Sequence, residues 1–156
     1  MDNTYNCLLP PGYVIRKAKP FDMWLIRLFI IRGRLDPSQL KWQQFWVVEH
    51  NRSLVAFGQL RNFEFAQEIG SLSVLPAYRN RGLGTFIIQH LIAQSTQLLY
   101  LKCLKHKLEF FYAQRGFISV SYEELPVSLK YKFRLSQLRK NLLKAFVLFM
   151  KYQAPI

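Results

Sequence analysis

The stretch that decides the fold runs over residues 74–92 and reads VLPAYRNRGLGTFIIQHLI. A strand is expected to end at its first residue, because Pro76 cannot continue a hydrogen-bonded ladder. The apolar residues after the turn recur at helical spacing, which predicts a helix over 83–95. Gly82 and Gly84 let the backbone of the turn approach a ligand closely. The stretch therefore predicts a strand, a glycine-containing turn and a helix.

Such a turn is suited to binding an anion. The first turn of a helix leaves backbone N–H groups without partners and carries the positive end of the helix dipole. Arg79 and Arg81 add positive charge beside it, so a pyrophosphate is the expected ligand. The alternative is a helix start with two solvated arginines. The glycine patterns of the P-loop and of the Rossmann dinucleotide site are both absent from the sequence.

Two motifs resemble one known family. Residues 79–84, RNRGLG, are similar to the R/Q-x-x-G-x-G/A signature of the GCN5-related N-acetyltransferases (GNAT). Residues 110–117, FFYAQRGF, resemble the Y-x-x-x-G-F motif of the same family. The two motifs come in the family's order, and the resemblance is strongest over 68–117.

The resemblance implies acetyl-CoA as a co-substrate, and the scattered cysteines and histidines suggest no metal ligand set, so no metal is expected. In the family, the strand before the turn pairs with the pantetheine arm, which here would place Leu72, Ser73 and Val74 beside the pantetheine and thioester. The phosphates would be held by the turn, with Arg79 at the first position of the signature, followed by Asn80, Arg81, Gly82, Leu83, Gly84 and Thr85. A longer acyl donor remains open.

The resemblance also implies two catalytic side chains. Glu68 lies 11 residues before Arg79, where several family members place a glutamate base. Its alternatives are a solvated or salt-bridged carboxylate, with a water chain accepting the proton instead. Tyr112 opens the second motif and would donate a proton to the departing thiolate; its alternative is a structural tyrosine. Backbone N–H groups near Val74 would polarise the thioester carbonyl.

The predicted function is acetyl transfer to a primary amine, of a small molecule or a protein, directly within a ternary complex. The alternative is a non-catalytic acyl-CoA-binding or sensor domain. Two departures from the family keep it open, because Lys105 stands where the family often has asparagine and strand 98–103 carries no acid. Cys103, in that strand, is expected to be buried and inert.

The rest of the chain predicts an α/β (α+β) fold, a GNAT-like mixed, mostly antiparallel twisted sheet with helices on both faces. One N-acetyltransferase domain is expected over 1–156, with a basic helical insertion at about 127–144 before a final strand. The expected strands are 12–17, 45–49, 54–61, 67–74, 98–103, 117–121 and 145–152, and the expected helices 21–32, 40–44, 83–95, 107–115 and 128–144. One long helix through Met150 is the alternative for the tail.

The composition limits the classes of ligand and the cellular location that we expect. The 156 residues carry a net charge of +13, which attracts anions of any class. Cys7 and Cys103 form no C-x-x-C pattern, so a reducing, cytoplasmic location is expected. The most apolar segment, 23–31, is too short to span a bilayer.

Two features leave the partners open. The stretch 130–144 is rich in Lys and Arg, and we expect a solvated helix face there, with docking of an acidic partner, a membrane or RNA as the alternative. No dedicated nucleic-acid module accompanies it, and either a monomer or a homodimer is compatible with the sequence.

Aromatic residues before the turn are expected in the core, with an acceptor site as the alternative; they are Trp24, Phe29, Trp42, Phe45 and Trp46.

Overall fold

The structure is a computed structural model that describes residues 8–154, so Cys7 lies outside the described residues. Its strands are β1 (Tyr13–Lys17), β2 (Phe45–His50), β3 (Ser53–Phe63), β4 (Ala66–Val74), β5 (Leu98–Cys103), β6 (Phe117–Val120) and β7 (Leu148–Tyr152). Its α-helices are α1 (Met23–Arg32), α2 (Leu83–Gln94), α3 (His106–Ala113) and α4 (Val127–Leu143). Short 3₁₀ helices occur at Pro20–Asp22, Trp42–Gln44, Pro76–Tyr78 and Tyr122–Glu124.

The strands form a seven-stranded sheet in the order β1-β2-β3-β4-β5-β7-β6. The pairs β1–β2, β2–β3, β5–β7 and β6–β7 are antiparallel. The register of β2 against β3 shifts between Val48 and Glu49. This mixed, mostly antiparallel sheet with helices confirms the predicted fold class.

The chain divides into two compact units. Among the described residues, the first comprises 8–61 and 69–94, and the second comprises 62–68 and 95–154. The division cuts β3 and β4, so each of these two strands contributes to both units. The predicted phosphate-binding turn lies in the first unit, whereas Glu68 and Tyr112 lie in the second.

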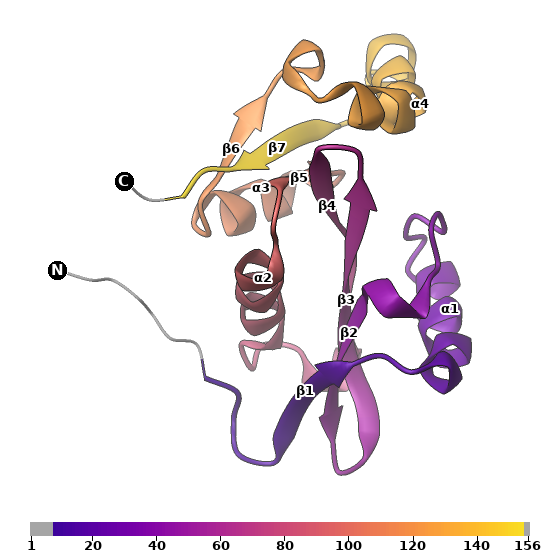
Figure 1. Cartoon of the computed structure of the whole chain (residues 1–156), viewed down its shortest axis with the longest axis vertical. Coiled ribbons are helices and arrows are strands. Elements are labelled where there is room, and N and C mark those ends of the chain that lie inside the picture. Colours follow the sequence, from indigo (N-terminus) through magenta and orange to yellow (C-terminus); the bar gives the residue numbers. More distant parts are fainter. Residues whose placement is uncertain (1–7, 155–156) are drawn as a thin grey trace, which may run out of the picture. The chain divides into compact units, whose positions relative to one another are not determined.

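In the first unit, α1 and α2 cover opposite faces of the strands β2 and β3 (Figure 1). On the α1 face, Met23 and Ile26 belong to a buried cluster that includes Phe57. On the α2 face, Gly58 lets the helix approach β3 closely, because a Cβ there would lie 2.6 Å from Cγ2 of Ile87. Burial of these apolar faces holds both helices against the strands.

In the second unit, α4 packs through Leu129 and Phe133, both fully buried. The ring of Phe133 stacks on Phe149 of β7 with 5.4 Å between centroids. Lys144 adopts a left-handed conformation with φ of 52° and ends the helix. The chain then turns into β7, so the helix followed by a final strand is confirmed and the single long helix is wrong.

The predicted helix at 40–44 is also wrong. Only the 3₁₀ helix Trp42–Gln44 forms there. Oδ1 of Asp36 accepts the Ser38 N–H at 2.9 Å, and Oδ2 accepts a hydrogen bond from Arg61 at 3.2 Å. The Arg61 side chain is 1% exposed, and a buried guanidinium requires a nearby anion. The Asp36 carboxylate therefore serves a local turn through one oxygen and the long-range ion pair through the other.

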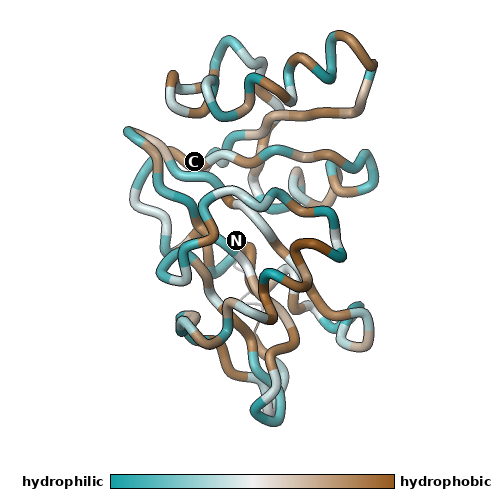
Figure 2. The backbone as a smooth tube through the Cα atoms, turned by 90° about the vertical axis from the view of Figure 1, so that its right-hand side faces the viewer, coloured by the Kyte–Doolittle hydropathy of each residue, from teal (hydrophilic) through white to brown (hydrophobic). Residues whose placement is uncertain are grey.

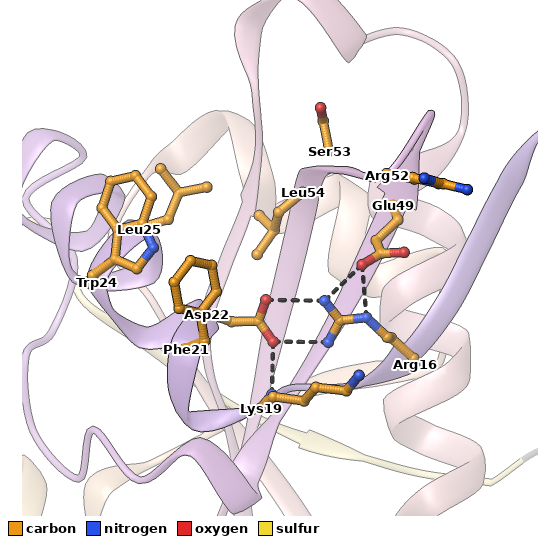
Figure 3. Close-up of a pocket in the computed structure, with 10 residues that line it drawn as sticks. All are labelled: Arg16, Lys19, Phe21, Asp22, Trp24, Leu25, Glu49, Arg52, Ser53 and Leu54. Atoms are coloured by element: carbon orange, nitrogen blue, oxygen red, sulfur yellow. Dashed lines mark hydrogen bonds and ion pairs between the residues drawn. The ribbon is translucent and has the colours of Figure 1, made fainter.

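A second ion-pair network closes the corner between β1 and α1 (Figure 3). The Arg16 guanidinium donates to both Asp22 oxygens, at 2.7 and 2.9 Å, and its Nε donates to Glu49 at 2.8 Å. The Lys19 N–H also donates to Asp22, at 2.6 Å. The hydrogen bond from Arg16 is the main cause that lowers the pKa of Asp22.

This lowered pKa makes a prediction for acid stability. A carboxyl whose folded pKa is depressed contributes stability above its unfolded pKa and loses it as the pH falls through the folded one. Asp22→Asn should therefore reduce the free energy of unfolding at pH 7 by about 1–3 kcal/mol. The difference from wild type should close progressively below about pH 4. Urea denaturation across pH measures this; the exposed control Glu64→Gln should show no such gap. An Asp22→Asn gap of equal size at acid and neutral pH would contradict the assignment.

Candidate functional site

The candidate site is the turn between β4 and α2. β4 ends at Val74, and the Leu75 N–H donates to the Val55 carbonyl at 2.9 Å. The chain then leaves the sheet through a 3₁₀ turn and passes two left-handed residues, Asn80 with φ of 63° and Gly82 with φ of 80°. The helix α2 begins immediately afterwards. The predicted strand, turn and helix are therefore confirmed.

The exposed residues of this turn are followed directly by a buried residue at the start of α2. Leu83 is 1% exposed and anchors the start of α2 in the core. The Gly82 carbonyl accepts the Phe86 N–H at 3.0 Å, which continues the helical pattern back into the turn. Residues 79–82 are exposed. The first turn of α2 therefore presents its backbone N–H end beside a solvent-accessible loop, as an anion site requires.

The two arginines of the turn both contact the protein. Nε of Arg79 donates to the carbonyl of Val74 at 3.0 Å. The Arg81 guanidinium donates to the Tyr13 hydroxyl at 2.9 Å and lies over the ring of Tyr78, 5.3 Å from its centroid. Each contact fixes one end of an exposed side chain and keeps its charge at the turn.

A ring cluster supports Arg81, and the sequence analysis did not identify it. Tyr13 stacks on His50 with 4.4 Å between centroids, and both rings meet Tyr78 edge-on. The three residues are far apart along the chain, and no local pattern joins them. Only the β1–β2 pairing, which puts Tyr13 opposite His50, brings them to the turn.

The strand before the turn carries the predicted pantetheine residues. Leu72, Ser73 and Val74 are half-buried. Leu72 lies on the α2 side, because its Cδ1 is 3.5 Å from the Cβ position of Gly58. Ser71 belongs to the other side, where its hydroxyl donates to the Asp36 carbonyl at 3.4 Å. Contact of these three residues with a pantetheine arm remains a prediction.

Glu68 is buried in an ion pair. Its side chain is 3% exposed and lies 2.5 Å from Nζ of Lys132 on α4. The same ammonium lies 5.5 Å from the ring centroids of Phe63 and Phe133. This is the salt-bridged arrangement that the sequence left open as the alternative, and the role as a base remains a prediction.

Tyr112 lies on α3, with its ring edge-on to Phe111 and Phe117. Burial, with a smaller contribution from Cys103, raises the pKa of Tyr112 to about 12. The phenol is therefore fully protonated at neutral pH. Cys103 is 1% exposed, and its thiol donates to the Lys105 carbonyl at 3.3 Å. Burial raises the pKa of this thiol as well, which suits a structural residue.

The aromatic residues before the turn divide into two groups. Phe45 is fully buried, Phe29 packs against the same core, and Trp46 meets His90 of α2 with 4.3 Å between rings. Trp24 and Trp42 are 58% and 39% exposed. Trp24 and Phe21 form one wall of a pocket of about 420 Å³ whose other wall is the Arg16 network (Figure 3).

Within residues 8–154, no group of three or more His, Cys, Asp or Glu side chains could hold a metal ion. Over the same residues, no helix is both long enough and apolar enough to cross a membrane.

A family model described as "Acetyltransferase (GNAT) domain" matches residues 41–119. The chain belongs to the GNAT acetyltransferase family. The matched region runs from the residue before the 3₁₀ helix Trp42–Gln44 to β6 and contains both the turn and Tyr112. Among curated proteins, none matches the chain significantly.

Solved GNAT structures share the fold. N-acetylglutamate synthase from Neisseria gonorrhoeae, complexed with coenzyme A and N-acetyl-glutamate, is 22% identical with a TM-score of 0.68, over 94% of this chain and 36% of that one. Rv2747 from Mycobacterium tuberculosis, in complex with CoA, is 21% identical with a TM-score of 0.69, over 91% of this chain and 99% of that one. Arabidopsis thaliana Naa50, with the bisubstrate analogue CoA-Ac-MVNAL, is 16% identical with a TM-score of 0.59, over 92% of this chain and 99% of that one. This chain thus spans about a third of the gonococcal synthase.

The GNAT turn makes a prediction for acetyl-CoA binding. Gly82→Asp would place a side chain and a negative charge beside the amides that should receive the pyrophosphate, and we expect at least a tenfold loss of affinity, roughly the effect of one charge-assisted hydrogen bond. Gly82→Ala is the matched control, because it strains the same positive φ without adding charge. Isothermal titration calorimetry on both folded variants measures the difference. Wild-type affinity in Gly82→Asp would remove the turn from the binding site.

Proposed function

We propose that this protein is an acetyl-CoA-dependent N-acetyltransferase that moves an acetyl group to a primary amine. The observation that carries the proposal is the exposed turn with left-handed Asn80 and Gly82 at the start of α2. Membership of the GNAT family and the coenzyme A in related solved structures support acetyl-CoA as the co-substrate. The turn residues 79–85 would hold its phosphates, and Leu72, Ser73 and Val74 its pantetheine arm.

The acceptor class is proposed from the relatives. One is a synthase bound to N-acetyl-glutamate, and another is bound to an analogue that joins CoA to an acetylated peptide. Both ligands carry an acetylated amine, on an amino acid in one case and on a peptide in the other. We therefore propose a primary amine, on a small molecule or a protein, as the acceptor here.

The reaction we propose is a direct transfer. The neutral amine attacks the thioester carbonyl, the C–N bond forms, and the C–S bond breaks as the CoA thiolate leaves. One proton leaves the nitrogen, and one is taken up by the sulfur. Backbone N–H groups near Val74 would stabilise the oxyanion that forms at the carbonyl. Cys103 is buried, and burial raises the pKa of its thiol, so we propose no acyl-enzyme on this residue.

We propose Glu68 as the group that accepts the amine proton, acting through water. A carboxylate that is nearly inaccessible cannot touch a bulky acceptor directly, whereas one water can relay the proton. The ion pair with Lys132 holds the carboxylate in position. A water chain along backbone carbonyls is the competing route.

Two variants separate catalysis by Glu68 from its structural role. Glu68→Gln should lower kcat by roughly 100-fold and change the pH profile, as loss of a general base does. Lys132→Gln breaks the same ion pair but keeps the carboxylate, so it should lower Tm with a much smaller loss of kcat. Steady-state kinetics across pH and thermal melting are measured on both. If both variants lose Tm and keep kcat, Glu68 is structural and the base lies elsewhere.

Tyr112 is proposed to assist the leaving group by donating a hydrogen bond. A thiol ordinarily has a pKa near 8.5, whereas the pKa of Tyr112 is about 12. Complete proton transfer from this phenol to the thiolate is therefore unfavourable at equilibrium. A hydrogen bond to the developing thiolate costs no ionisation and still stabilises the transition state. We therefore propose that Tyr112 donates a hydrogen bond to the thiolate and does not transfer its proton.

Tyr112→Phe tests this role because it removes only the hydroxyl. We expect matched losses in kcat and kcat/KM with CoA affinity little changed, the pattern of an interaction made in the transition state. The matched control is Tyr122→Phe, because the Tyr122 hydroxyl donates a structural hydrogen bond to the Lys130 carbonyl at 2.6 Å. That variant should lose about 1 kcal/mol of stability and keep its kcat. Normal turnover in Tyr112→Phe would exclude the residue from the mechanism.

A non-catalytic acyl-CoA-binding or sensor domain is the second candidate. Two observations favour it, the ion pair that occupies Glu68 and the absence of an acidic residue in β5. The two candidates differ in turnover. Thiol release from acetyl-CoA in the presence of an amine library, with acetylated products identified by mass spectrometry, supports the enzyme. Tight acetyl-CoA binding without release across the library supports the sensor.

A further inference from the structure

The outer face of α4 carries a continuous row of exposed apolar side chains. The residues recur every three or four positions and therefore lie along one side of the helix. They are Val127, Tyr131, Leu135, Leu138 and Leu142, which are 82%, 81%, 61%, 51% and 70% exposed. We call these five residues the outer stripe. On a helical projection they span an arc of only about 80°.

The outer stripe is separate from the face that α4 buries. Leu129 and Phe133 point into the core of the second unit and are fully buried. They lie roughly opposite the stripe around the helix, at about 100° per residue. The helix is therefore apolar on two sides, and only one of them is used in the fold. The hydropathy colouring of the chain shows hydrophobic and hydrophilic residues interleaved along α4 (Figure 2).

Basic side chains border the outer stripe on both edges. Arg134 and Arg139 fall on either side of it at this helical spacing, and both are exposed. Residues 127–144 contain six Lys or Arg and no Asp or Glu. One of the six, Lys132, pairs with Glu68 within the second unit. The stripe is therefore flanked by cations on both edges, with no acidic side chain of α4 beside it.

We propose that α4 docks lengthwise on an anionic lipid bilayer. An apolar strip flanked by cations is the arrangement with which a helix lies in the plane of a membrane interface, its apolar side in the headgroup and acyl boundary. The leucines would enter the boundary, Tyr131 would sit at the level of the headgroups, and the flanking arginines would reach the lipid phosphates. The helix lies on the membrane and does not cross it.

Charge and shape favour lipid over other occupants. A second copy of the chain would bring the flanking arginines of two stripes together, which like-charge repulsion opposes. A nucleic acid would use the cations, but aliphatic leucines give it no base stacking. A protein partner would need an acidic groove shaped to this convex strip. A fluid bilayer accepts a convex strip without such complementarity. The inference does not depend on the proposed enzymatic activity.

Co-sedimentation with lipid vesicles tests the proposal. The full chain should bind vesicles that mix phosphatidylcholine with phosphatidylglycerol and should bind poorly to phosphatidylcholine alone. Leu138→Gln combined with Leu142→Gln keeps the net charge, and we expect it to weaken binding by roughly tenfold or more, because two apolar contacts are lost. These side chains are exposed, so the melting temperature and acetyl-CoA affinity should match wild type.

A charge-matched pair isolates the position of the cations. Arg134→Gln with Arg139→Gln should weaken vesicle binding by roughly tenfold or more. Lys41→Gln with Arg52→Gln removes the same charge from exposed positions of the first unit and should change binding by less than about threefold. Equal loss in both pairs would reduce the effect to net charge and overturn the proposal.

Three further outcomes would also overturn it. The leucine variant could bind vesicles as wild type does. Size-exclusion chromatography could show a dimer that the leucine variant converts to monomer, with no vesicle binding. The chain could bind RNA, but not vesicles, with no dependence on the leucines.

The Gly82→Asp variant separates membrane docking from acetyl-CoA binding. Loss of its acetyl-CoA affinity with intact vesicle binding would show that the two functions are independent.

Discussion

The site depends on one backbone constraint, the left-handed conformation of Asn80 and Gly82 between β4 and α2. It turns the chain from a strand into a helix within a few residues and leaves the turn exposed while Leu83 is buried behind it. Side chains with a Cβ adopt such φ values at a cost, which is why glycine stands at the second position. The helix dipole and the N–H groups of the first turn of α2 then face the loop. This geometry suits the phosphate site that we propose, before any charged side chain is considered.

Side chains far from the turn in sequence then fix its surroundings. Tyr13 and Tyr78 contact Arg81, and His50 packs against both of their rings. Gly58 lets α2 approach β3 closely. The same unit contains a fully buried guanidinium, that of Arg61, with Asp36 as its counter-ion. The first unit is therefore held together by polar pairs as well as by apolar packing.

Local patterns predicted most of this architecture. The periodicity of 83–95, the proline at 76 and the glycine at 82 were sufficient for the strand, turn and helix, because their causes lie within a few residues. The helix predicted at 40–44 does not form, and Asp36 in the preceding loop pairs with Arg61, a long-range contact that no local pattern contains. The ring cluster could not be predicted, since only the β1–β2 pairing assembles it. In α4 the charges were evident, but which of its two apolar sides would be buried depended on tertiary packing against Phe149.

The central claim is that the backbone of this turn binds the pyrophosphate of acetyl-CoA, and amide NMR tests it most directly. Uniformly ¹⁵N-labelled protein would be titrated with coenzyme A, with sodium sulfate as an ionic control. We predict saturable shifts that are largest for the N–H groups of residues 80–85 and that exceed those caused by sulfate. Saturable shifts centred on other parts of the chain, with these amides unmoved, would contradict it.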